Sequence, residues 1–258
     1  MDVNLNVSIP LEGILNPLLA PAAKTVGEGI NSIFTFVLYP LLKGGIYTQK
    51  HLTDYRNAIE NKIKQIPEEN RDPNGLPIAL KAFNESKYQL NDGLIRSMFS
   101  TLIAASVDNR KNKNISPRFP VVISQLSSND ARFLVNFIRS TYNSFPAYRY
   151  KMISKNHNLG YKYFGQTNIC FNIHNGEISN NDKSLYNLVY LGICDYFRNT
   201  YLTDKKSSDV YNSAETIALN MSLSEYSNSN SIESIKVNKE YIKLTTFGIE
   251  FKNILLNN

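Results

Sequence analysis

The stretch "NDGLIRSMFSTLIAASVDN", residues 91–109, gives the strongest structural signal in the sequence. Asn91 or Asp92 is suited to cap a helix N-terminus, because a side-chain oxygen there accepts a hydrogen bond from a first-turn amide. Apolar side chains then recur at intervals of three and four, which places one broad stripe on a helix: Leu94, Ile95, Met98, Phe99, Leu102, Ile103 and Val107. We therefore expect a buried helix around which the surrounding chain packs.

The chain around this helix has the composition of a folded globular protein. Its 258 residues are 42% hydrophobic and 19% charged, with 16 Tyr, 13 Phe and no Trp. Its two cysteines, Cys170 and Cys194, form no CxxC pair, so neither a disulfide scaffold nor a zinc site is predicted. No signal peptide is recognisable in residues 1–7, and no uncharged stretch reaches the roughly 20 residues that span a bilayer. These features predict a cytoplasmic protein without a cofactor.

Residues 49–165 read as a series of helices. Residues 53–65 mix charges with regularly spaced apolar side chains and end before Pro67, which is typical of a surface helix. Pro77 and Pro117 are suited to the first turns of two further helices. Ser127 and Asp130 resemble a capping box for a helix over 131–140. The expected fold class is mainly α, with a multi-helix core in this region.

The last third, residues 166–258, has a different character. Tyr and Asn become frequent, and residues 168–173 and 234–244 favour β-strands. The order helix, strand, loop, strand predicts a small α+β module that resembles a winged helix, with a mobile Ser/Asn-rich loop over 222–234. The tyrosine-rich residues 142–164, at the end of the helical segment 49–165, are left without an assigned role.

The N-terminal segment, residues 1–48, carries an amphipathic apolar stripe. Pro17 and Pro21 interrupt its first half, so two helices are expected rather than one. The stripe has two open interpretations, a core-facing surface or a membrane-active one. It comprises Ile14, Leu15, Leu18, Leu19, Ile30, Ile33, Phe34, Val37, Leu38 and Leu41.

The net charge of +6 is concentrated in one part of the chain. Between residues 114 and 167 seven cations accompany a single acid, Asp130, whereas cations and acids balance in the remaining residues. Such a run indicates either a solvated helix surface or a patch that binds an acidic partner, and both interpretations stay open. The seven cations are Arg118, Arg132, Arg139, Arg149, Lys151, Lys155 and Lys162.

Residues 95–134, "IRSMFSTLIAASVDNRKNKNISPRFPVVISQLSSNDARFL", resemble the abortive infection alpha family of bacterial phage-resistance proteins. The resemblance implies a role in antiphage defence, and it carries no catalytic residue with it. It is borne by a helix, a short basic linker, an S-P-x-F segment and a Q-L-S-x-x-D-A turn. We expect structural roles for six of its residues: Arg96, Met98, Phe99, Asp108, Pro117 and Asp130.

No convergent catalytic set is recognisable, so we expect a protein that is not an enzyme. Arg96 and Asp108 are charged residues beside an apolar stripe, but an arginine that binds nearby carbonyl groups and an aspartate that caps a turn explain them more simply. The histidines lack the HxxxH and HExxH spacings of metal sites: His51, His157 and His174.

Two functional hypotheses follow. In the first, the protein senses a phage protein, moves from the cytoplasm to the inner face of the cell membrane, and disrupts that membrane with its N-terminal apolar helices, as a homo-oligomeric pore in one version. In the second, it is a winged-helix DNA-binding regulator. DNA is the less favoured partner, because residues 168–258 carry more acidic than basic side chains.

Overall fold

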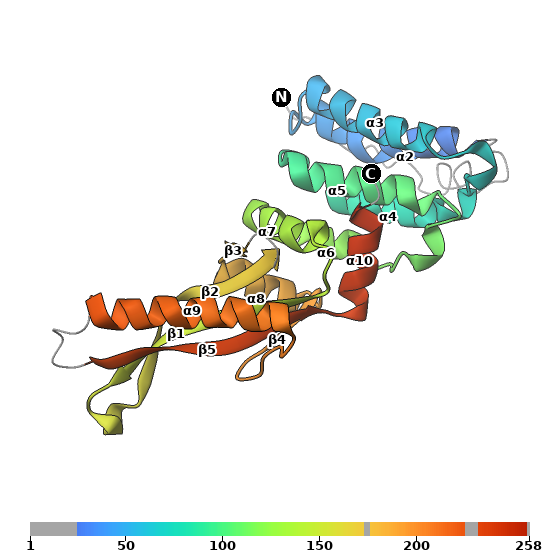
Figure 1. Ribbon diagram of the computed structural model, residues 1–258. Helices are drawn as coiled ribbons and strands as arrows, with labels where there is room; N and C mark the ends of the chain where they lie inside the picture. Colours follow the sequence, from blue (N-terminus) through green and yellow to red (C-terminus); the bar gives the residue numbers. More distant parts are fainter. Residues whose placement is uncertain (1–24, 173–175, 225–231, 257–258) are drawn as a thin grey trace, which may run out of the picture. The chain divides into compact units, whose positions relative to one another are not determined.

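A computed structural model describes residues 25–172, 176–224 and 232–256 (Figure 1). The chain divides into two compact units, Met1–Leu126 and Ser127–Asn257, which we name the helical unit and the sheet unit. The sequence suggested different boundaries, with segments 1–48, 49–165 and 166–258. The last of those boundaries falls inside a strand of the sheet described below.

The helical unit is built around α5 (Gly93–Ser106), the helix expected from the periodicity. Asp92 caps it, since the side-chain oxygen accepts the backbone N–H groups of Leu94 and Ile95, each at 2.9 Å. Helices α3, α4 and α6 pack against α5. The other elements of this unit are α2 (Val26–Lys43), α3 (Gln49–Lys64), η1 (Glu68–Asn70), η2 (Pro73–Gly75), α4 (Leu76–Ser86), η3 (Asn112–Asn114) and α6 (Phe119–Ser124).

Helix α2 contributes the described half of the apolar stripe, and this half is buried. Thr25 and Glu28 form a capping box at its start, and the helix packs against α3 and α4. The Phe34 ring lies 6.3 Å from that of Tyr55 and 6.0 Å from that of Phe83. Six stripe residues are therefore core in this structure: Ile30, Ile33, Phe34, Val37, Leu38 and Leu41. The other four lie outside the described residues: Ile14, Leu15, Leu18 and Leu19.

The sheet unit contains a five-stranded antiparallel sheet with the strand order β3-β2-β1-β5-β4 (Figure 1). The strands are β1 (Ser144–Ser154), β2 (Tyr161–Asn172), β3 (Glu177–Ser179), β4 (Cys194–Phe197) and β5 (Ile232–Leu244). The helices are α7 (Ser128–Arg139), η4 (His157–Leu159), α8 (Asp182–Tyr190), α9 (Lys205–Ser224) and α10 (Thr246–Leu256).

The register of β1 and β5 defines two faces of this sheet. On one face, which we name the α9 face, Tyr148 packs against Tyr211 and Ala214 of helix α9. On the opposite face, which we name the α7 face, Phe137 of α7 lies 5.2 Å from the ring of Phe145 in β1. Side chains alternate between faces along a strand, so Ala147, Arg149 and Lys151 follow Phe145 on the α7 face.

The described residues are mainly helical, as expected, but a winged-helix module is not confirmed. Strand β1 and the start of β2 come from residues 142–164, which lie before the expected module. Helix α9 covers residues 205–221, for which the sequence predicted no element, and enters the segment 222–234 that was expected to be a mobile loop, of which 225–231 lie outside the described residues. Tyrosine, lysine and arginine combine apolar and polar parts, so the alternation in β1 and β2 is hard to recognise in the sequence.

Candidate functional sites

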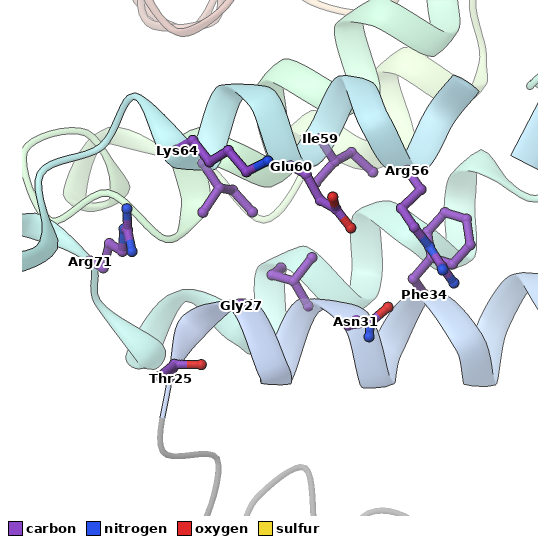
Figure 2. A pocket seen from close by; sticks show the side chains of 11 residues that line it. Thr25, Gly27, Asn31, Phe34, Arg56, Ile59, Glu60, Lys64 and Arg71 are labelled. Atoms are coloured by element: carbon purple, nitrogen blue, oxygen red, sulfur yellow. The ribbon is translucent and has the colours of Figure 1, made fainter. Parts of the chain in front are cut away.

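The helical unit contains a pocket of about 350 Å³ between α2 and α3, which we name the α2–α3 pocket (Figure 2). Its apolar lining comes from both helices: Ile30, Phe34, Ile59 and Ile63. Polar and charged side chains complete the wall: Thr25, Asn31, Arg56, Glu60, Lys64 and Arg71. An apolar cavity with a few convergent polar groups is the usual form of a small-molecule site.

The cations of this pocket differ in how they are held. The Arg56 guanidinium lies over the Phe34 ring, 4.5 Å from its centroid, and within the described residues its buried Nε has no hydrogen-bond partner. Arg71 donates its Nε to the carbonyl oxygen of Ile66 at 3.1 Å. Lys64 is exposed at the end of α3. The pocket therefore offers positive charge that the described fold uses only in part.

The sheet unit buries an ion pair on its α7 face. The fully buried Glu240 carboxylate accepts from the Nη2 of Arg149 at 2.9 Å and from its Nε at 3.3 Å. The Asn238 side-chain amide donates to the same carboxylate at 2.7 Å, and the Tyr196 hydroxyl donates to it as well. Burial by itself lowers the pKa of Arg149, but the bonds and charge of Glu240 outweigh it and raise that pKa. This network ties β1, β4 and β5 together.

Beyond this ion pair, the α7 face carries alternating cations and tyrosines. Arg149 lies over the ring of Tyr163, 3.9 Å from the centroid, and Lys151 lies over that of Tyr161 at 5.1 Å. Lys236 of β5 stands directly opposite Lys151. We name these five residues the cation–tyrosine face. Tyr161 is 53% exposed, so the face is open to solvent at this end.

The seven cations of the expected basic patch are distributed over both units. Arg118 precedes α6 in the helical unit, and the other six belong to the sheet unit. Arg132 and Arg139 are exposed on α7, whereas Lys162 is exposed opposite Met152 on the α9 face. Lys155 follows β1. A single partner-binding patch of all seven stays a prediction, and Arg149 is already engaged by Glu240.

In the helical unit, the family-motif charges contact nearby chain. Arg96 donates to the carbonyl oxygen of Leu90 at 2.9 Å. The buried Asp108 accepts from the guanidinium of Arg110 at 2.8 and 2.7 Å and from its backbone N–H at 3.1 Å. The bonds from Arg110 hold the pKa of Asp108 below its ordinary value. Met98 and Phe99 are core residues of α5.

At the junction of the units the motif residues also serve the local backbone. Ser127 and Asp130 form the expected capping box of α7, and Asp130 also accepts from the side chain of Asn187 at 2.9 Å. The expected helix after Pro117 begins two residues later, at Phe119, with Pro120 in its first turn. Proline is tolerated there because a first-turn N–H has no partner within the helix.

Both cysteines are buried free thiols. Burial raises the pKa of Cys194 to about 12 and raises that of Cys170 as well, which disfavours the reactive thiolate. His51 belongs to the start of α3, where its Nδ1 lies 3.3 Å from the Thr48 hydroxyl. Across residues 25–172, 176–224 and 232–256, no three or more His, Cys, Asp or Glu side chains converge as metal ligands.

Sequence reasoning missed the α2–α3 pocket. Its cations come from residues 56–71, where four basic side chains accompany three acidic ones, so a charge count along the chain gives little signal. Within the described residues, no helix combines the length and the apolar character needed to cross a bilayer.

Comparison with known proteins yields one match. The family model described as abortive infection alpha matches residues 47–255, which include most of both units. Neither a curated protein nor a solved structure matches the chain.

Proposed function

The chain belongs to the abortive infection alpha family, and from this premise we propose that it takes part in antiphage defence by binding an acidic phage protein through its cation–tyrosine face. Recognition would occur in the bacterial cytoplasm, where phage proteins are made. The family supplies the defence role, and the charges of the sheet unit support the kind of partner.

The observation that carries the proposal is the cross-strand pair of Lys151 and Lys236. The two lysines are directly opposite on neighbouring strands, so their side chains emerge on the same face. Like charges in such a pair destabilise a sheet, and within the described chain neither ammonium group forms an ion pair. A carboxylate from a partner would relieve this repulsion, so the arrangement favours an acidic ligand.

The tyrosines support a protein partner. Tyr161 and Tyr163 present rings whose centroids lie 5.3 Å apart, each beneath a cation. Tyrosine and arginine are enriched among the residues that dominate binding energy at protein interfaces, because a rigid ring covers a large area at little entropic cost. The face thus combines stacking area with positive charge.

We also propose that the protein acts without bond-making chemistry. The carboxylates with the most buried surroundings are engaged internally, Asp108 by Arg110 and Glu240 by Arg149. Burial raises the pKa of both thiols. These groups support the framework of the two units, and a purified protein that turned over a substrate would contradict this part of the proposal.

The hypothesis of membrane disruption requires a rearrangement. Helix α2 would have to leave its contacts with α3 and α4 and expose six buried apolar side chains, which costs about 1.5–3 kcal/mol for each fully buried residue. Membrane entry and assembly into a homo-oligomeric pore are therefore treated as alternative outcomes of the experiment below.

The test is phage protection by a Lys151→Glu/Lys236→Glu variant. The matched control, Lys162→Glu/Lys205→Glu, makes the same charge change with exposed lysines of β2 and α9. We expect the first variant to stay folded and its protection to fall at least about tenfold, because like charges against an acidic partner cost several kcal/mol. The control should protect like the wild type.

Three results would contradict the proposal. They are full protection by the first variant, a loss of protection by the control that equals the loss by the first variant, or a loss of protection by the first variant that its unfolding explains. Membrane potential, followed in the same cultures, separates the alternatives. Membrane entry would be supported if the wild type depolarises the cells and a folded variant with a charged residue in place of Val37 does not. Salt-sensitive binding of double-stranded DNA that the first variant loses would instead support the regulator.

A further inference from the structure

We propose that the α2–α3 pocket of the helical unit binds a ribonucleoside monophosphate or a closely related ribose phosphate ester with an aromatic base. The pocket is a different site from the cation–tyrosine face, and this proposal does not depend on the function proposed for that face. Its volume of about 350 Å³ lies within the range of small-molecule sites.

One end of the pocket is suited to an aromatic base. The Arg56 guanidinium lies over the Phe34 ring, 4.5 Å from its centroid, and guanidinium groups also stack on heterocycles. The Arg56 Nε is buried and lacks a hydrogen-bond partner among the described residues. A buried donor without a partner is costly, so an acceptor of the ligand that reached it in the plane of the guanidinium group would be favourable.

The other end is suited to a phosphate. Figure 2 shows Thr25 and Gly27 there, at the start of α2, with Arg71 on the same side of the pocket. Lys64 lies in the last turn of α3, the helix that packs along α2. The N-terminal end of α2 is positive but already holds the Glu28 carboxylate of the capping box, and Arg71 also pairs with Glu68 at 3.7 Å. The positive charge that a phosphate would meet at this end therefore comes from the Lys64 and Arg71 side chains.

The middle of the pocket is suited to a ribose. Asn31 and Glu60 lie between the two ends, from α2 and α3 respectively (Figure 2). A carboxylate accepts hydrogen bonds from the vicinal hydroxyl groups of a ribose, as acidic residues do in dinucleotide sites. The apolar lining of Ile30, Ile59 and Ile63 then contacts the carbon face of the sugar.

Length and charge both match this ligand. Gly27 and Phe34 are seven residues apart on one helix, which is a rise of about 10 Å and comparable to the distance from a base to its 5′-phosphate. The pocket carries three cations and one acid. Among the lining residues this is a net positive charge, opposite in sign to the charge of about −1.5 to −2 that a phosphate monoester has near neutral pH, and Arg71 also pairs with Glu68 outside the lining.

The experiment is calorimetric titration of the purified full chain with AMP, GMP, CMP and UMP. Adenosine, ribose 5-phosphate and inorganic phosphate are the partial ligands. We expect at least one nucleoside monophosphate to bind about tenfold or more tightly than any partial ligand, since only it spans both ends of the pocket. A higher salt concentration should weaken the binding of the nucleotide and leave the binding of adenosine unchanged.

Two variants divide the site. Lys64→Glu should lower the affinity for the nucleotide at least about tenfold and leave the affinity for adenosine unchanged, because it reverses a charge at the phosphate end only. Arg56→Lys keeps the charge but removes the planar guanidinium group. It should therefore lower the affinity for both adenosine and the nucleotide and leave the affinity for inorganic phosphate unchanged. Lys50→Glu, an exposed lysine at the opposite end of α3, is the matched control and should bind like the wild type.

The proposal is overturned if no nucleoside monophosphate binds the folded full chain. It is also overturned if inorganic phosphate binds as tightly as the nucleotide, or if Lys50→Glu weakens binding as much as Lys64→Glu does. Thermal unfolding of each variant, measured without ligand, ensures that a loss of binding is not a loss of fold.

Discussion

The two units bury different chemistry at the centre of their folds. In the helical unit the large fully buried side chains are rings and aliphatic groups, such as Phe83, Phe99 and Leu38. The sheet unit largely buries both members of the Arg149–Glu240 ion pair and also Lys252, whereas the buried carboxylate of the helical unit, Asp108, pairs with a half-exposed arginine. The comparison teaches that shape and volume dominate the first unit, whereas matched polar partners specify the strand register of the second.

Lys252 illustrates how the sheet unit uses a buried charge. Its ammonium group donates to the carbonyl oxygens of Ser140 and Tyr142, at 2.6 and 3.1 Å, just beyond the end of α7. Cations are favourable there because the C-terminal carbonyl groups of a helix lack partners within it. Burial lowers the pKa of Lys252, and these bonds hold the charged form in place.

The largest expected effect comes from removing the buried charge of Glu240. Replacing Glu240 by Ala leaves the partly buried Arg149 without its counter-charge and should lower the free energy of unfolding by about 3–5 kcal/mol. Chemical denaturation monitors the loss. The paired change Arg149→Met/Glu240→Leu removes both charges and should cost much less. Equal losses for the single and paired changes would show that packing, not charge pairing, holds the strands.

In the helical unit the matching test removes volume. Leu38 of α2 is fully buried, so Leu38→Ala should lower the free energy of unfolding by about 2–5 kcal/mol through lost burial and a residual cavity. Denaturation at two ionic strengths should give the same loss, because no charge is involved. A loss below about 0.5 kcal/mol would mean that α2 contributes little to this core.

The variant Lys252→Met tests the contribution of the second buried charge of the sheet unit. The variant keeps a long apolar side chain but leaves two partly buried carbonyl groups without their donor, so a loss of about 1–3 kcal/mol is expected. Lys183→Met, at an exposed position of α8, is the control and should change the stability little. If the two variants were equally stable, the bonds from Lys252 would not matter to the fold.

A smaller effect is expected in acid. The pKa of Asp108 is lowered in the folded protein, so this carboxylate adds stability above its unfolded pKa of about 4 and that contribution is lost as the pH falls through the folded value. Asp108→Asn should therefore be less stable than the wild type at neutral pH and lose less on acidification. Stability curves between pH 7 and pH 2 measure this, and parallel curves would exclude a role for Asp108 in the acid response.

The difference between the units also explains how far the sequence predicted the fold. Helix α5 and the capping box of Ser127 and Asp130 are recognisable because their signals are local and their apolar spacing is regular. Helix α9 gave no such signal, since its buried residues include small alanines, Ala214 and Ala218, while Leu219 and Leu223 are exposed.

The candidate sites were predicted only in part. The run of cations includes Lys151, whose part in binding stays a prediction, and the partner of Arg149 is Glu240, 91 residues later in the chain. Strand pairing brings such residues together, and nothing in local spacing reports it. The α2–α3 pocket depends likewise on the packing of two helices. Whether the apolar stripe serves any role beyond the core stays a prediction.

The most direct test of the proposed function is capture from phage-infected cells, followed by mass spectrometry after nuclease treatment. The wild type and Lys162→Glu/Lys205→Glu should retain the same acidic phage protein, which raised salt releases, and Lys151→Glu/Lys236→Glu should not retain it. Equal retention by the folded Lys151→Glu/Lys236→Glu variant, or loss of the captured protein on nuclease treatment alone, would contradict recognition of an acidic phage protein by the cation–tyrosine face.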